Sequence, residues 1–192
     1  MKIQKCLLLL LLSSCSIVAF AQDEEGEEKK GFDPEKLFFG GTFGASFGSY
    51  TFVNVSPIVG YQFNRYFAAG TGINFIYSSS KYDYGNPNLD YKNEYGVVGL
   101  PVFARFYPIH FLFLHAQPEM NYTWGKVKFY DGSPEQKLDP KFVPSVLVGI
   151  GAAIPLGANG KGAMTVMYQY DVVQDVRSPY GTNGFLSIGF NF

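Results

Sequence analysis

Gly184-Phe185-Leu186-Ser187-Ile188-Gly189-Phe190-Asn191-Phe192 alternates apolar side chains with small or polar ones. In an extended strand, alternate side chains lie on opposite faces. One face of this strand therefore carries Leu186, Ile188, Phe190 and Phe192. If that face meets lipid, the strand must be paired on both sides, because hydrocarbon offers no partner for free backbone donors and acceptors. This condition is met in a closed barrel.

Seven further stretches show the same alternation. They span residues 37–47, 53–63, 67–77, 98–107, 112–124, 145–154 and 163–172. Eight spans of about 10 residues, with their connections, account for residues 37–192. No stretch has apolar residues at helical spacing. The sequence therefore predicts an all-β protein, an eight-stranded antiparallel up-and-down β-barrel that spans a membrane.

The connections between the expected strands alternate in length. Short turns are expected near Asn64, Pro108 and Asn159, and longer loops near Ser49, Gly85, Gly132 and Pro179. The two longest polar connections cover residues 79–93 and 125–141. Outer-membrane barrels have short periplasmic turns and long extracellular loops. We therefore expect the second set of connections outside the cell.

Glycines and aromatic residues occupy different parts of the expected barrel. Small residues relieve crowding in a narrow lumen, and the inward-facing glycines are Gly40, Gly44, Gly60, Gly70, Gly72, Gly149, Gly151 and Gly189. Aromatic girdles mark the two membrane interfaces. The periplasmic girdle would contain Tyr61, Phe63, Phe67, Phe106 and Phe192, and the outer one Tyr77, Tyr122, Trp124 and Tyr170.

Four prolines lie inside expected strands: Pro57, Pro101, Pro118 and Pro144. Proline has no N–H to donate to a neighbouring strand. In a closed barrel every strand has two neighbours, so bulges or local gaps in the pairing are expected at these positions.

The first 36 residues differ from the rest. Residues 1–21 combine Lys2 and Lys5, an apolar run and the ending Ala19-Phe20-Ala21, which is typical of a cleaved signal peptide. The alternative is lipidation of Cys15, because Leu12-Ser13-Ser14-Cys15 fits a lipobox. Residues 22–36 contain a run of acidic residues followed by lysines, and we expect a disordered acidic leader there.

The chain resembles the small outer-membrane β-barrel family of Gram-negative bacteria, a porin-like group that includes OmpX and the membrane domain of OmpA. The resemblance covers residues 37–192 and rests on the signal peptide, the hairpin rhythm, segments such as 59–63 and 100–102, and the terminal aromatic strand. It implies a location in the outer membrane. It also implies that Leu186, Ile188, Phe190 and Phe192 form the signal read by the barrel assembly machinery.

Polar side chains on the inner face form the candidate site. They are Arg105, His115, Gln117, Glu119, Gln169 and Asp171. We interpret them as a hydrogen-bonded network that fills the lumen. The alternative is a lipid-modifying hydrolase with His115 as base, Glu119 or Asp171 as its orienting acid, and Ser145 or another hydroxyl as nucleophile. A second alternative is a narrow pore, although eight strands leave room only for side chains.

No cofactor or metal site is predicted. Residues 83–90 offer oxygen-bearing side chains but lack the spacing of a calcium loop. The formal charge of −1 argues against nucleic acid as a partner. A lipocalin-like soluble barrel would reverse the two faces and needs a polar exterior, which the sequence supplies only in part. We therefore expect a non-enzymatic outer-membrane protein that contacts lipid and the assembly machinery. Its role would be structural or one of interaction, either with a protein partner at the extracellular loops or as a subunit of an outer-membrane assembly.

Overall fold

The computed structural model describes residues 32–86, 90–156 and 162–192. The chain divides into two units, residues 1–33 and 34–192, and every strand of the described residues belongs to the second unit. The predicted signal peptide and residues 22–31 of the predicted leader lie outside the described residues. The last three leader residues, Pro34–Lys36, form a single 3-10 turn before the first strand. Among the described residues, no helix is long and apolar enough to cross a membrane.

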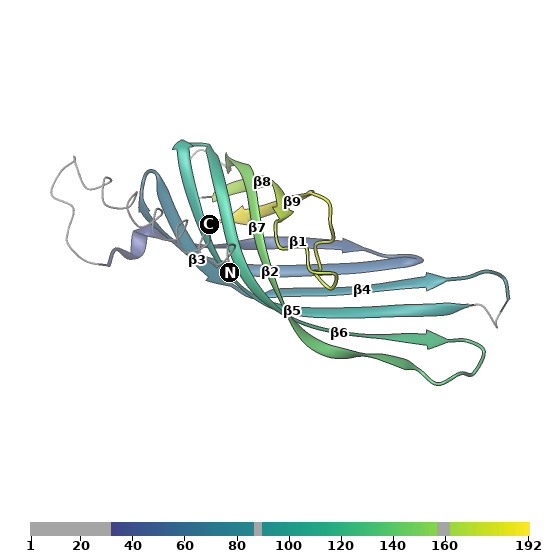
Figure 1. The fold of residues 1–192 in the computed structure, drawn as a ribbon. Helices are drawn as coiled ribbons and strands as arrows, with labels where there is room; N and C mark the ends of the chain where they lie inside the picture. The colour runs from purple at the N-terminus through teal and green to yellow at the C-terminus, as the bar shows by residue number, and fades with distance from the viewer. Residues whose placement is uncertain (1–31, 87–89, 157–161) are drawn as a thin grey trace, which may run out of the picture. The chain divides into compact units, whose positions relative to one another are not determined.

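Nine strand segments form one antiparallel sheet (Figure 1). They are β1 (Leu37–Ser46), β2 (Tyr50–Asn64), β3 (Phe67–Gly72), β4 (Asn74–Tyr82), β5 (Tyr91–Ile109), β6 (Leu112–Phe129), β7 (Gln136–Leu156), β8 (Gly162–Asp171) and β9 (Phe185–Asn191). β3 and β4 both pair with β2 on one side and β5 on the other, so together they fill one place in the ring. β9 pairs with β1 and closes the ring. The predicted eight-stranded closed antiparallel barrel is confirmed.

The expected third strand is interrupted at Ile73, which separates β3 from β4. On one side, pairing with β2 is lost opposite Pro57, and on the other, pairing with β5 is lost opposite Pro101. Both prolines lack the N–H that a ladder needs. One hydrogen bond bridges the gap on each side. Ile73 N donates to Pro57 O at 3.1 Å, and Thr71 Oγ1 donates to Pro101 O at 2.7 Å.

The other two prolines behave differently from each other. Opposite Pro118, the pairing of β5 with β6 is missing between Pro101 and Ala104. Pro144 pairs with Met120 without a gap. The backbone of Val146, two residues further on, faces the β8 side, so Pro144 faces that side as well. Pairing with β8 begins only at Leu147, and the missing N–H of Pro144 therefore interrupts no ladder.

The two faces of the wall differ sharply in exposure. Large side chains that point inward are buried, namely Ile76, Phe103, Phe113, Leu147 and Met167. Apolar side chains that point outward are exposed, among them Leu100, Val102, Phe142, Ile150 and Leu186. All four residues predicted for the outer girdle are also exposed: Tyr77, Tyr122, Trp124 and Tyr170. The core of this barrel is its lumen.

The sequence-based prediction is wrong at four strand ends. The expected loops 79–93 and 125–141 are partly strand, because β4 continues to Tyr82, β5 begins at Tyr91, β6 continues to Phe129 and β7 begins at Gln136. β5, β6 and β7 have 19, 18 and 21 residues, whereas about 9–11 residues cross a bilayer. The β4–β5 and β6–β7 hairpins, shown at the right of Figure 1, thus form a two-hairpin extension beyond the barrel.

β1 and β9 meet at the seam where the ring closes. When β3 and β4 are counted as one strand, the ladder at this seam is the shortest between any two neighbours in the ring. It contains three residue pairs, from Gly40 with Asn191 to Thr42 with Gly189. Phe39 and Phe192 add two backbone bonds of 2.9 and 2.7 Å. Residues 43–46 of β1 and 185–188 of β9 have no partner across the seam.

Crowding in the lumen predicts unequal effects for two inward-facing glycines. A Cβ at Gly70 would collide with the carbonyl oxygen of Val59 and would approach the Phe103 ring to 2.6 Å, whereas at Gly44 the nearest atom is Phe52 Cε1 at 3.8 Å. Gly70→Val should lower the free energy of unfolding by about 1–3 kcal/mol. Gly44→Ala should change it by less than about 0.5 kcal/mol. Urea unfolding of the refolded barrel measures both, and equal midpoints would contradict the assigned inner face.

Candidate functional site

All six predicted lumen residues point inward. Arg105 lies directly opposite His115 across the β5–β6 hairpin. Gly149 follows in the same row and then Gln169, which leans over the glycine with its Cγ about 3.1 Å from the position of a Cβ. Of the six predicted lumen residues, five are buried and Gln117 is half-buried.

Arg105 is held by aromatic rings. It is 3% exposed, and its guanidinium carbon lies 5.0 Å from the centre of the Phe103 ring and 4.9 Å from that of Phe113. Such cation–π contacts stabilise a cation that has lost water. When the Asn191 amide is oriented with its oxygen towards the arginine, that oxygen accepts from Arg105 Nη1 at 3.1 Å. Among the described residues, no carboxylate forms an ion pair with Arg105.

Glu119 is the centre of the first hydrogen-bonded group. It accepts from Gln117 Nε2 at 2.9 Å, and Gln117 Oε1 lies 3.1 Å from His115 Nε2. On its other side it accepts from Asn74 Nδ2 at 3.1 Å and from the hydroxyl of Tyr180 at 2.9 Å. Its carboxylate therefore has several donors in place of water, as a buried charge requires.

Asp171 is the centre of the second group. Its Oδ1 accepts from the backbone N–H groups of Val146 and Val173, both at 3.1 Å. Its Oδ2 accepts from Ser178 Oγ at 2.6 Å. Ser145 lies 3.3 Å from Ser178 and accepts from Asn121 Nδ2 at 3.3 Å. The two groups meet where Tyr180 N donates to Ser178 Oγ at 3.3 Å.

The segment between β8 and β9 folds back towards the lumen. The sequence predicts an outer loop near Pro179, but it does not predict that Ser178 and Tyr180 of this loop reach Asp171 and Glu119. Tyr180 also stacks on Phe185 at 5.3 Å, and Tyr95 donates to the carbonyl of Arg177 at 2.6 Å. The segment has no alternating pattern, so nothing in the sequence marks these two side chains as part of the site.

The base and the nucleophile of the hydrolase alternative, His115 and Ser145, do not meet. The side-chain hydrogen bond of His115 goes to Gln117, and those of Ser145 go to Asn121 and Ser178. A nucleophile needs its base within hydrogen-bonding reach. In the described part of the chain, no hydrogen bond joins Ser145 to His115. The cavity beside Arg105 has a volume of about 70 Å³, enough for a few water molecules.

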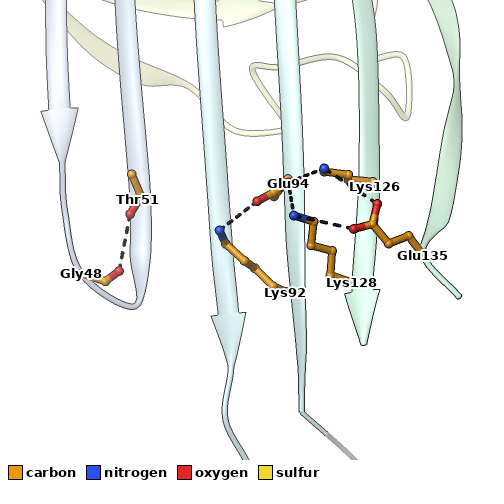
Figure 2. Close-up of polar contacts among 7 residues, drawn as sticks. All are labelled: Gly48, Thr51, Lys92, Glu94, Lys126, Lys128 and Glu135. Atoms are coloured by element: carbon orange, nitrogen blue, oxygen red, sulfur yellow. Dashed lines mark hydrogen bonds and ion pairs between the residues drawn. The ribbon is translucent and has the colours of Figure 1, made fainter. Parts of the chain in front are cut away.

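The outward face of the extension carries an ion-pair cluster (Figure 2). Glu94 on β5 lies 2.8 Å from Lys92 Nζ, 3.3 Å from Lys126 Nζ and 3.8 Å from Lys128 Nζ. Glu135 lies 3.7 Å from Lys128 and 3.9 Å from Lys126. The hydrogen bond from Lys92, followed by that from Lys126, lowers the pKa of the Glu94 carboxyl. We call Lys92, Lys126 and Lys128 the lysine cluster.

The opposite face of the extension is aromatic. Tyr82 and Tyr91 are paired across β4 and β5 and stack with their ring centres 4.6 Å apart. Phe129 is paired with Tyr91 on the other side, and Tyr84 lies 6.5 Å from the Tyr91 ring. Tyr82 and Tyr84 are exposed. One sheet thus presents a charged face and an aromatic face.

A metal site has no support in the described residues. No group of three or more His, Cys, Asp and Glu side chains there could hold an ion. In the candidate calcium loop, Asp83 accepts from Gly85 N at 3.0 Å and Asp90 accepts from Tyr84 N at 2.7 Å, as residues that shape a turn do. Residues 87–89 of that loop lie outside the described residues.

Comparison with known proteins adds no assignment. No protein-family model matches the sequence, and no curated protein matches it significantly. Any functional assignment therefore rests on the fold and on the residues themselves.

The folded-back segment predicts a local effect of one hydroxyl group. Tyr180→Phe removes the bonds to Glu119 and Asn74, and bonds to charged groups contribute about 1.5–3 kcal/mol each. Hydrogen exchange of residues 172–184 should become at least tenfold faster, as measured by mass spectrometry. Tyr66→Phe, in the exposed turn between β2 and β3, is the control. Unchanged exchange in the Tyr180 variant would show that the segment is held elsewhere.

Proposed function

We propose that this chain is a small outer-membrane β-barrel protein of a Gram-negative bacterium, of the OmpX or OmpA membrane-domain type. The outward face supports this proposal. A continuous belt of exposed aliphatic and aromatic side chains surrounds a lumen that is rich in polar groups. Exposed apolar surface of this extent is typical of a membrane or protein interface. A lipocalin-like soluble barrel needs the opposite distribution.

We further propose that the protein has no enzymatic activity and acts through its two-hairpin extension. The observation that carries this is the aromatic face around Tyr82 and Tyr91. Tyrosines supply large contact area at a small cost in conformational entropy, and they are enriched at protein interfaces. A structure that only had to cross the membrane would need strands about half as long. The extension therefore suits the binding of a protein partner outside the cell.

The last strand is proposed to direct assembly of the barrel. Leu186, Ile188, Phe190 and Phe192 share the outward face, and all four are exposed. β9 also has to complete the ring by pairing with both β8 and β1. A strand that must be placed last in a lipid environment is a suitable segment for the barrel assembly machinery to read.

A charged residue at Phe192 tests membrane assembly. Phe192→Asp places a carboxylate on the lipid-facing side of the seam, so the amount of folded barrel in the outer-membrane fraction should fall at least tenfold. Folded barrel is measured by its heat-dependent shift on SDS gels. Phe192→Tyr keeps the ring and serves as the control. Normal levels of the Asp variant, or recovery of the unaltered protein in a soluble fraction, would count against the proposal.

The aromatic face is tested by partner capture. Tyr82→Ser with Tyr91→Ser should leave the barrel folded but should lower the yield of co-purified protein at least fivefold in a mild-detergent pull-down from outer membranes. Tyr66→Ser, at the opposite end of the barrel, is the matched control. If both variants retain the same proteins in the same amounts as the unaltered chain, the extension does not provide the binding surface.

A further inference from the structure

Two members of the lysine cluster, Lys92 and Lys128, lie in one row of the extension with a third lysine, Lys81. Lys81 on β4 is directly opposite Lys92 on β5, and Lys92 is directly opposite Lys128 on β6. Like charges placed opposite each other across strands are destabilising. In the next row, Lys126 has Glu94 on one side and Lys137 on the other. This arrangement keeps ammonium groups close together at a cost in stability.

The carboxylates nearby do not fully balance these charges. Glu94 alone is in contact with all three members of the lysine cluster, and its side chain is 14% exposed. Glu135 contributes only two contacts, of 3.7 and 3.9 Å, and its side chain is 44% exposed. Asp83 lies 3.5 Å from Lys81. Lys137 forms no ion pair with any described residue.

The cluster lies immediately beyond the outer aromatic girdle. On β6 the outward-facing series runs Tyr122, Trp124, Lys126 and Lys128, and on β4 Lys81 follows Tyr77 on the same face. Each step of two residues advances the strand by about 7 Å or less along its tilted course. Aromatic belts lie at the level of lipid headgroups. The ammonium groups therefore lie at or just above that level and point outward.

We propose that the lysine cluster binds phosphate groups of lipids in the outer leaflet. This inference rests on the proposed location in the outer membrane. Glu94 positions the three ammonium groups on one small area of the sheet, as Figure 2 shows, and their remaining positive charge faces the lipid. Side-chain exposures of 34–38% leave each lysine able to turn towards a second anion. The negative charge of a phosphate group would balance the positive charge of the lysine cluster that Glu94 leaves uncompensated.

The test uses the whole refolded barrel in phosphatidylcholine vesicles that contain either diphosphoryl or monophosphoryl lipid A. After extraction in mild detergent, native mass spectrometry measures the fraction of barrel that retains lipid A. We expect stronger retention of the diphosphoryl form. Lys92→Gln with Lys126→Gln and Lys128→Gln should lower this retention on the order of 10- to 100-fold, because each lysine near an anionic surface contributes roughly fivefold. Lys141→Gln, which removes the lysine paired with Asp175, should not.

Two further measurements separate the explanations. Glu94→Gln should retain lipid A at least as well as the unaltered chain, and a loss would show that the lysines serve only to pair with Glu94. Excess inorganic phosphate should not displace the lipid; full displacement would indicate a site for a free anion. Equal retention of both lipid A forms, or a triple variant that binds lipid normally but loses a co-purified protein, would overturn the inference.

The same samples report on the proposed function. A barrel that floats with the vesicles and shows the heat-dependent shift on SDS gels has inserted. Insertion without discrimination between the two forms of lipid A contradicts the lysine inference alone. Failure to insert into any vesicle contradicts the proposed location itself.

Discussion

The structure depends on one constraint, which is that each strand of a closed ring must satisfy its backbone hydrogen bonds on two sides. The prolines show how strictly this holds. Pro57 is in register with Ile73 on one side of the strand and Pro101 with Gly72 on the other, so the two missing donors fall in adjacent rows and share one interruption of the wall. Pro144 lies where β7 has not yet met β8, and its lost donor interrupts nothing. Pro118, by contrast, interrupts the ladder between β5 and β6.

The narrow lumen imposes the second constraint. Large rings are placed next to glycines, such as Phe38 beside Gly60 and Phe113 beside Gly151, because a Cβ at either glycine would collide with the ring. Polar groups in this space need partners from within it. The wall gives each oxygen of Glu119 one donor, from Asn74 and Gln117, and the hydroxyl of Tyr180 from the segment after β8 adds a further donor. The interior is therefore completed by a residue outside the strands.

The barrel itself could be predicted from the sequence, because the alternation of side chains is fixed by contact with lipid on one face and the lumen on the other. The strand ends could not. The alternation of apolar side chains ends before Lys92, Glu94, Lys126 and Lys128. Backbone pairing does not depend on side-chain polarity, so the strands continue past these residues towards the tips of the hairpins. The place of Tyr180 was equally hidden, since its contact with Glu119 joins residues 61 positions apart. Proline chemistry predicted gaps in the pairing, but the meeting of two such gaps at Gly72 and Ile73 depends on a register that only the folded sheet reveals.

The short ladder between β1 and β9 has a consequence for the order of events in folding. Gly40 and Asn191 come from opposite ends of the barrel sequence, so bringing them together closes the longest loop in the ring. Neighbouring hairpins close short loops and have long ladders, such as that between β5 and β6. Contacts between distant segments form slowly because the chain entropy is lost before the bonds are gained. We therefore expect the open sheet from β1 to β9 to form before the ring closes. The closing step depends on the few backbone hydrogen bonds around Gly41 and Phe190.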